Sequence, residues 1–182
     1  MAHVWYTNYT LPDDCQVWPK TITEGRTKSW LEDDYDTITY FVDGACRNNG
    51  LSNSKGACAY FSGPSRYNSW EDPAGRSTSQ TAELGAIYGA LCKARNHNEN
   101  NIKILTDSKY AVNAIKVWPH VYWQTNTTDG IWRRGNGKDV ANQQLLKRIQ
   151  SKMRGMSVDI QYISRDKNQI ADRLAKEKLR QL

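Results

Sequence analysis

Strand-like and helix-like stretches alternate along this chain of 182 residues from residue 36 onward, and this alternation limits the folds that it can adopt. The first strand, TITYFVD, alternates and is rich in β-branched residues, and the first helix places Leu84, Ile87 and Leu91 on one stripe. The order βββαβαβα with one interruption predicts an α/β domain with a mixed sheet and helices on both faces. The predicted strands span residues 37–43, 56–62, 66–72, 102–107 and 157–163, and the predicted helices span residues 80–97, 108–118, 138–153 and 168–179.

Residues 1–35 differ from this regular part of the chain. They contain Trp5, Trp18 and Trp30 and show no clear periodicity, so we treat them as an N-terminal extension of unassigned structure. The start, MAHVWYTNYT, lacks the basic region and following apolar region of a signal peptide. No apolar run approaches the roughly 18 residues of a membrane span.

Cysteine usage bears on the compartment. The four cysteines, Cys15, Cys46, Cys58 and Cys92, are scattered and show no metal-ligand spacing. This pattern argues against a zinc site and makes a reducing compartment the default. We therefore expect an intracellular protein of the nucleus or cytoplasm, with no membrane partner.

Positive charge is concentrated in one segment. The chain carries a net charge of +6, and residues 116–154 hold eight basic residues and two acids, so the remainder is neutral. Trp118, Trp123 and Trp132 lie in the same segment. Basic residues interleaved with aromatic ones suit a polyanion with sugars and bases to stack on. A solvated helix face with buried tryptophans is the alternative.

Four acids lie where predicted strands end or helices begin: Asp43, Glu83, Asp107 and Asp172. Acids at element ends can converge on one point, where they repel each other unless a cation lies among them. Mg²⁺ prefers such oxygen ligands, and two ions can clamp both oxygens of a reacting phosphodiester. Each acid alone also has an ordinary explanation, because Asp107 could cap the next helix and Asp172 could be a surface acid.

The phrases around these acids are YFVDGACRNNG, STSQTAELGAI, ILTDSKYAVNAI and ISRDKNQIADRLA. With them, the chain from about residue 36 to 180 resembles the ribonuclease H family of the cellular type 1. The resemblance implies a ribonuclease H-like α/β fold, in which a five-stranded mixed sheet is flanked by helices. It also implies a ribonuclease H domain over residues 36–182, with a basic handle inserted at about residues 117–138.

The activity implied by this resemblance is endonucleolytic hydrolysis of the RNA strand of an RNA/DNA hybrid. Asp43, Glu83, Asp107 and Asp172 would hold two Mg²⁺ ions, for which Mn²⁺ could substitute. Asp43 would bridge both ions, Glu83 and Asp107 would fill separate shells, and Asp172 would help to position the attacking water. We expect a monomer whose partner is the hybrid; protein partners are not predicted.

Further residues match positions that bind nucleic acid in the family. Arg76, Thr78 and Asn142 correspond to a pocket for a DNA phosphate. Asn49 and Gln80 correspond to contacts with the RNA strand, where 2′-hydroxyls distinguish RNA from DNA. Ser79 replaces a frequent asparagine beside that glutamine, and a serine offers fewer hydrogen-bonding atoms.

The handle supplies the last predicted contacts. Trp132, Arg133 and Arg134 match the place where the DNA strand crosses it, with the indole on deoxyribose and the guanidinium groups on phosphates. Trp118 and Trp123 are predicted to be packing residues. The loop SRDK before the last helix is short and has no histidine, unlike many active members, so slower turnover is expected.

Three other interpretations are possible. A catalytically silent hybrid-binding domain is disfavoured because a pure binder gains nothing from a repulsive carboxylate cluster. A related 3′–5′ exonuclease would require Asp-x-Glu on the first strand, where this chain has Asp43-Gly44-Ala45. A ribonuclease H domain from a retroelement reverse transcriptase remains open.

Overall fold

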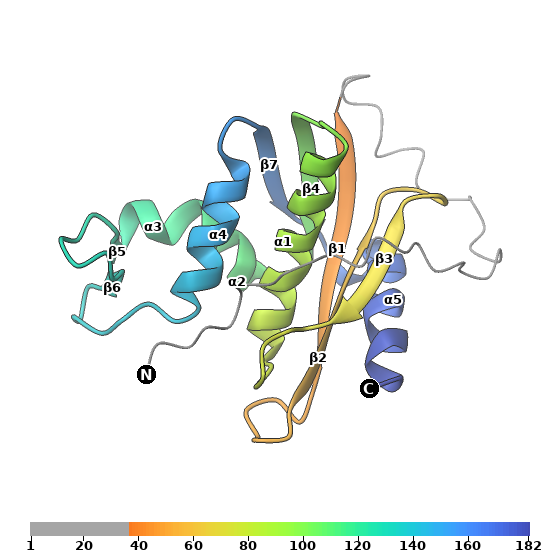
Figure 1. The fold of residues 1–182 in the computed structure, drawn as a ribbon, viewed down its shortest axis with the longest axis horizontal. Helices are drawn as coiled ribbons and strands as arrows, with labels where there is room; N and C mark the ends of the chain where they lie inside the picture. Colours follow the sequence, from red (N-terminus) through yellow and green to blue (C-terminus); the bar gives the residue numbers. More distant parts are fainter. Residues whose placement is uncertain (1–36) are drawn as a thin grey trace.

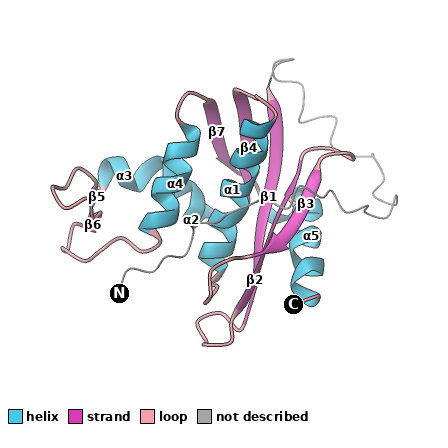
Figure 2. Cartoon of the chain, in the orientation of Figure 1, coloured by secondary structure: helices cyan, strands magenta, loops and turns pink. Residues whose placement is uncertain are grey.

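The computed structural model describes residues 37–182, and the predicted extension at residues 1–35 lies outside the described residues. Figure 1 shows the order of the elements, and Figure 2 shows how loops separate them. No helix in the described part is both long and apolar enough to cross a membrane. The elements are β1 (Ile38–Arg47), β2 (Lys55–Phe61), β3 (Tyr67–Glu71), α1 (Ser79–Asn96), β4 (Asn101–Thr106), α2 (Lys109–Val112), the π-helical turn η2 (Asn113–Val117), α3 (Trp118–Val121), β5 (Trp123–Gln124), β6 (Arg133–Arg134), α4 (Gln143–Met153), β7 (Ser157–Tyr162), the 3₁₀ turn η3 (Arg165–Lys167) and α5 (Gln169–Arg180).

Five strands form one mixed sheet in the order β3-β2-β1-β4-β7. β1 pairs antiparallel with β2 and parallel with β4, while β4 pairs parallel with β7. In Figure 1, α1 and α4 lie on one side of this sheet and α5 lies on the other. The predicted five-stranded mixed sheet flanked by helices is therefore confirmed. Because β1, β4 and β7 run in the same direction, their C-terminal ends meet at one edge.

Successive side chains of β1 pack on opposite faces of the sheet. Tyr40 and Val42 are fully buried in the larger core, which α1 covers. Phe41 points to the opposite side and packs against a smaller cluster that includes Leu174 and Ala175 of α5. Burying a side chain the size of Leu174 contributes roughly 1.5–3 kcal/mol, so the second cluster holds α5 against the sheet. Both helices that carry predicted acids are thereby fixed to the same strand.

The helix predicted for residues 108–118 is interrupted. Ser108 caps it as predicted, because its Oγ accepts the Ala111 N–H at 3.1 Å. The chain then passes through the π-helical turn into α3, where Pro119 lies in the first turn. Proline has no N–H to donate to the preceding turn, so a regular helix cannot continue through this position.

The prediction of a helix over residues 138–153 is wrong at its start, because α4 begins at Gln143. Val140 donates its N–H to the carbonyl of Trp132 at 2.8 Å, which holds this stretch in an extended conformation beside the β5–β6 pair. Asn142 then adopts a left-handed conformation with φ 58°, which breaks any helix entering from before it. The handle thus ends in a turn that presents the Asn142 side chain.

Candidate active site

The register of the sheet places two of the predicted acids side by side. Val42 of β1 pairs with Thr106 of β4, so Asp43 and Asp107 are the next residues on neighbouring parallel strands. Gly44 brings α1 to the same point, because a Cβ there would lie 2.3 Å from the backbone nitrogen of Glu83. A side chain at this position would push the helix away, so glycine is required for the close approach of Glu83.

Asp43 lies at the centre of the cluster and is only 5% exposed. Burial, and then the negative charges of Asp107 and Asp172, raise the pKa of Asp43 to about 8. Asp43 thus interacts with Asp107 and Asp172, and Glu83 interacts in turn with Asp107. Four carboxylates from distant parts of the sequence therefore converge, as an acidic cation site requires.

Glu83 is held by the start of the next helix. Its Oε2 accepts a hydrogen bond from the Ser108 hydroxyl, whose oxygen also caps α2. Burial raises the pKa of Glu83, with a further contribution from the charge of Asp107. Ser108 therefore couples the orientation of Glu83 to the helix that follows Asp107.

Both oxygens of Asp107 have protein partners. Oδ1 accepts from the Asn168 amide at 3.1 Å, and Oδ2 accepts from Nε of Arg165 at 2.9 Å. Burial acts to raise the pKa of Asp107, but the hydrogen bonds from Arg165 and Asn168 outweigh it and hold this pKa below its usual range. Burial and like charges thus disfavour the ionised form of Asp43, whereas the donors around Asp107 favour its ionised form.

Asn168 was missed by sequence reasoning. It is fully buried, and its amide also donates to the carbonyl of Val42 at 2.9 Å, which ties the middle of β1 to the start of α5. Its position four residues before Asp172 was visible in the sequence, but an asparagine there reads equally well as a helix-start residue. Only the fold shows that it joins β1 to the residue that follows β4.

Asp172 lies in the first turn of α5 and its side chain is largely buried. Its Oδ2 pairs with Nζ of Lys176, one helical turn further on, at 2.7 Å. Each of the four predicted acids therefore lies in the cluster and also interacts with a neighbouring residue.

The chemistry of the donors fits a hard divalent cation, although the side chains are turned to protein partners. Within residues 37–182 no three His, Cys, Asp or Glu side chains are grouped as ligands of one ion. The donors available are carboxylate oxygens, which Mg²⁺ and Mn²⁺ prefer. The Asn168 Oδ1 atom is buried and has no hydrogen-bond partner among the described residues.

The residues predicted to bind nucleic acid separate into distinct places. Asn142 donates to the Tyr110 hydroxyl at 3.0 Å and contacts Oε1 of Gln80 at 3.5 Å. Arg76 instead donates to the carbonyl of Gly50 in the β1–β2 loop. The direct contacts of Asn142 are thus with Gln80 and Tyr110, and those of Arg76 are with the loop that carries Asn49.

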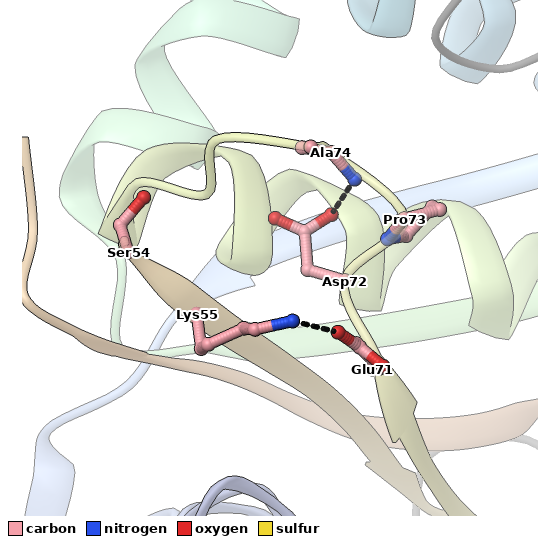
Figure 3. Close-up of a pocket in the computed structure, with 7 residues that line it drawn as sticks. Ser54, Lys55, Glu71, Asp72, Pro73 and Ala74 are labelled. Atoms are coloured by element: carbon pink, nitrogen blue, oxygen red, sulfur yellow. Dashed lines mark hydrogen bonds and ion pairs between the residues drawn. The ribbon is translucent and has the colours of Figure 1, made fainter. Parts of the chain in front are cut away.

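Thr78 and Ser79 begin α1. Thr78 is the N-cap, and it exchanges hydrogen bonds with Thr81 in a capping box. Asp72 supports this turn, because its buried carboxylate accepts from the Thr81 hydroxyl at 2.7 Å and from the Ala74 N–H at 3.2 Å. Figure 3 shows Asp72 beside Ala74 in a pocket of about 410 Å³. Asp72 therefore holds the segment that carries Arg76 against α1.

Trp132 differs from its predicted role. It is 6% exposed and belongs to the main core, with Nζ of Lys147 on α4 5.5 Å from its ring centre. Lys147 of α4 and Trp123 lie against its indole, and this burial favours a packing role over the predicted contact with a sugar. Arg133 is paired with Asp129 at 2.5 Å, whereas Arg134 is exposed.

An aromatic groove lies beside the buried tryptophan. It measures about 500 Å³. Tyr110, Trp118 and Trp123 form a chain of ring contacts with centroids 5.7 and 5.6 Å apart, so the packing role predicted for Trp118 and Trp123 agrees with their contacts. Tyr110 and Tyr122 were missed, although the aromatic content of SKYAVNAIKVWPHVYW was a usable signal. The groove is lined by Gln80, Tyr110, Trp118, Tyr122, Trp123, Arg134 and Ala141.

A mixed five-stranded sheet with one carboxylate within β1, one directly after β4, one near the start of α1 and one in the first turn of α5 defines the class of ribonuclease H-like proteins. The sequence model of the family described as RNase H matches residues 35–180, and the chain belongs to this family, in its type 1 branch. Divalent metal ions are general to the family.

The similar proteins include curated and solved examples. Ribonuclease H1 of Mus musculus is 29% identical over 168 residues, which are 90% of this chain and 56% of that protein. The chain spans about half the length of the curated mammalian relatives that it matches. The crystal structure of RNase H1 from Halobacterium salinarum is 25% identical, covers 80% of this chain and 99% of that one, and has a TM-score of 0.56. LC11-RNase H1, solved in complex with an RNA/DNA hybrid, is 17% identical with a TM-score of 0.59, covers 79% of this chain and 97% of that one, and shares the fold.

Proposed function

We propose that this chain is an endoribonuclease that hydrolyses the RNA strand of RNA/DNA hybrids. The observation that carries the proposal is the convergence of Asp43, Glu83, Asp107 and Asp172 on one edge of the sheet. Because the pKa of Asp43 is raised to about 8, the cluster costs the fold stability as the pH rises from about 4 to about 8, and bound cations would offset this cost. Membership of the RNase H family and the hybrid-bound structure of LC11-RNase H1 support the choice of substrate.

Two Mg²⁺ ions, for which Mn²⁺ could substitute, would be held by these four acids. Two such ions activate a water molecule and stabilise the departing oxygen of a phosphodiester. Asp43 is the most central carboxylate and lies next to Asp107, so it is the residue suited to touch both ions. Ser108 and Asn168 keep Glu83 and Asp107 in fixed orientations, which favours a geometry prepared before substrate arrives.

The hybrid would lie across the start of α1. Asn49, Ser79 and Gln80 would face the RNA strand, where hydrogen bonds to 2′-hydroxyls give selectivity for RNA. The DNA strand would follow the aromatic groove, with Asn142 and Arg134 near its backbone, because aromatic rings and guanidinium groups suit sugars and phosphates.

A DNA phosphate pocket of Arg76, Thr78 and Asn142 remains part of this proposal. Thr78 lies at the N-terminus of α1, and Asn142 lies where the handle ends. Arg76 would have to break its hydrogen bond to the Gly50 carbonyl to reach a phosphate. Arg133 would contribute less than Arg134, because Asp129 and Asp139 already neutralise it. Trp132 would act by supporting the groove.

We further propose a monomer that functions in a reducing intracellular compartment, with residues 36–182 as the catalytic domain. The described cysteines Cys46, Cys58 and Cys92 form no disulfide, which suits that compartment.

The proposal is tested by incubating an end-labelled RNA/DNA hybrid with the chain and Mg²⁺, beside double-stranded RNA and DNA of the same sequence. Only the RNA strand of the hybrid should be cut, and EDTA and Asp107→Asn should each abolish cutting. Asp159→Asn is the matched control, since this half-exposed acid of β7 pairs with Lys116 and stands apart from the cluster. Tight binding of the hybrid without any cutting would favour a silent binding domain.

A further inference from the structure

The partners of Asp107 are of two kinds. Asn168, on Oδ1, is neutral and 1% exposed, so it is a permanent part of the interior. Arg165, on Oδ2, is a cation whose side chain is 74% exposed. Removing Asn168 from its place would leave buried polar groups unpaired, whereas the guanidinium of Arg165 can return to water at little cost. The two contacts therefore differ in how easily they exchange.

The backbone around Arg165 is anchored even though its side chain is exposed. Lys167 N–H donates to the Ser164 carbonyl at 2.9 Å, and Asn168 N–H donates to the Arg165 carbonyl at 3.0 Å, closing the turn η3. The buried Asn168 side chain fixes the end of this turn to β1 and β4. A movement of the guanidinium away from Asp107 therefore requires side-chain rotation alone, with no rearrangement of the loop.

A divalent ion and Arg165 would require the same oxygen of Asp107. A carboxylate oxygen that carries a guanidinium N–H at 2.9 Å cannot take up a metal ion on that side until the donor leaves, and the two cations repel each other. The partner of Glu83 differs, because Ser108 is neutral and buried, and it occupies Oε2 only. Arg165 is thus the exposed cation that competes for Asp107.

We propose that Arg165 is an exchangeable counter-ion of the acid cluster: its guanidinium pairs with Asp107 until a divalent ion takes that oxygen, and it then turns to a phosphate of the bound RNA strand. The first half concerns only cation binding. The second half rests on the proposed function, because it requires a substrate phosphate next to the acids. A guanidinium released at this edge has the planar set of donors that suits a phosphate.

The first half is tested by titrating Mg²⁺ into the full-length chain and following backbone amide signals by NMR. Arg165→Gln should bind Mg²⁺ about two- to five-fold more tightly than the native chain, because removing the exposed cationic partner of this ion pair removes competition on the order of 1 kcal/mol. Arg165→Lys should fall between them, since it keeps the charge and loses the planar fork.

Arg180→Gln is the matched control, because it removes the same charge from an exposed site eight residues beyond Asp172 on α5, about 12 Å along the helix axis. Mg²⁺ affinity of Arg165→Gln equal to or weaker than that of the native chain, or no different from that of Arg180→Gln, would overturn the competition.

The second half is tested by hybrid cleavage at saturating Mg²⁺. Arg165→Gln should raise KM several-fold relative to Arg180→Gln, with a smaller change in kcat, because the lost group contacts a phosphate. An unchanged KM would overturn this half alone. If the native chain cleaves no hybrid, the proposed function fails, and the Mg²⁺ titration still decides whether Arg165 competes for Asp107.

Discussion

The acid cluster and the handle both concentrate charge, but they balance it in different ways. In the cluster, Asp43 is buried among like charges, and no basic side chain pairs with it directly among the described contacts. In the handle, Arg133 pairs with Asp129 and Asp139 on the surface, and the aromatic rings pack against each other. The cluster thus has excess negative charge that a bound cation can neutralise. In the handle, ion pairs already neutralise Arg133, and the packed rings form a surface for binding.

The largest effect should follow from removing the central carboxylate. Asp43→Asn should lower the rate of hybrid cleavage on the order of 10³-fold, as is typical when a preorganised electrostatic group is lost. Single-turnover cleavage of labelled hybrid measures this rate. The exposed handle acid Asp139, changed to Asn, provides the comparison and should retain nearly all activity. Equal losses in the two variants would remove the distinction between cluster and handle.

Truncation of the buried tryptophan tests whether the handle is a packed unit. Trp132→Ala should reduce the free energy of unfolding by about 3 kcal/mol, since a buried aromatic side chain leaves a cavity. Tyr122→Ala, at a 63% exposed position of the same handle, should change it by less than about 0.5 kcal/mol. Urea unfolding measures both. A stable Trp132→Ala with weakened hybrid binding would instead support the predicted stacking role.

Asn168 tests how rigidly the cluster is held. Asn168→Asp keeps the shape but replaces the donor with an oxygen facing the Val42 carbonyl and the Asp107 carboxylate, so the chain should lose about 2 kcal/mol of stability. Asn136→Asp is a suitable reference, because it makes the same substitution at an exposed position. Its Oδ1 accepts a hydrogen bond from the Lys138 N–H, and an aspartate oxygen can still accept it. Urea unfolding at pH 7 measures both variants. The same midpoint for both would show that the hydrogen bonds of Asn168 to Val42 and Asp107 are dispensable.

The smallest effect is expected for the exposed charges of the handle. Arg134→Gln should reduce the salt slope of hybrid binding by roughly 0.9 for one lost phosphate contact. Arg133→Gln should reduce it less, because its ion pairs with Asp129 and Asp139 already offset its charge. Binding measured over a range of salt concentrations gives both slopes. A larger change for Arg133 than for Arg134 would mean that substrate opens these ion pairs.

Sequence reasoning reached the cluster because its acids are positioned by strand and helix ends. The end of β4 was predicted to within one residue, whereas β1 continues past its predicted end at Asp43 to Arg47 because it stays paired with β2. The parallel pairing of β1 with β4 stops at Val42 and Thr106, and this brings Asp43 and Asp107 together. Asn168 could not be recognised in this way, because its role depends on reaching Val42, which is 126 residues away in sequence.

The handle was less predictable for a related reason. Whether Trp132 faces solvent depends on how α4 packs over it, and that follows from the late start of this helix at Gln143. The left-handed conformation of Asn142 decides that start, and no periodicity in KDVANQQLL signals it. Local patterns specify strands and helices, whereas the exposure of a loop aromatic is set by the tertiary structure.

The most direct test of the central claim, that the four acids form a divalent cation site, is the melting temperature at pH 8.5 with and without Mg²⁺. The pKa of Asp43 is raised in the folded chain, so without a cation stability should fall as the pH rises from about 4 to about 8, by on the order of a few kcal/mol. Mg²⁺ should restore much of this loss in the native chain by binding the folded state. Asp43→Asn should melt higher than the native chain without Mg²⁺ and respond little to the ion. A native chain whose melting temperature does not respond to Mg²⁺ would contradict the account.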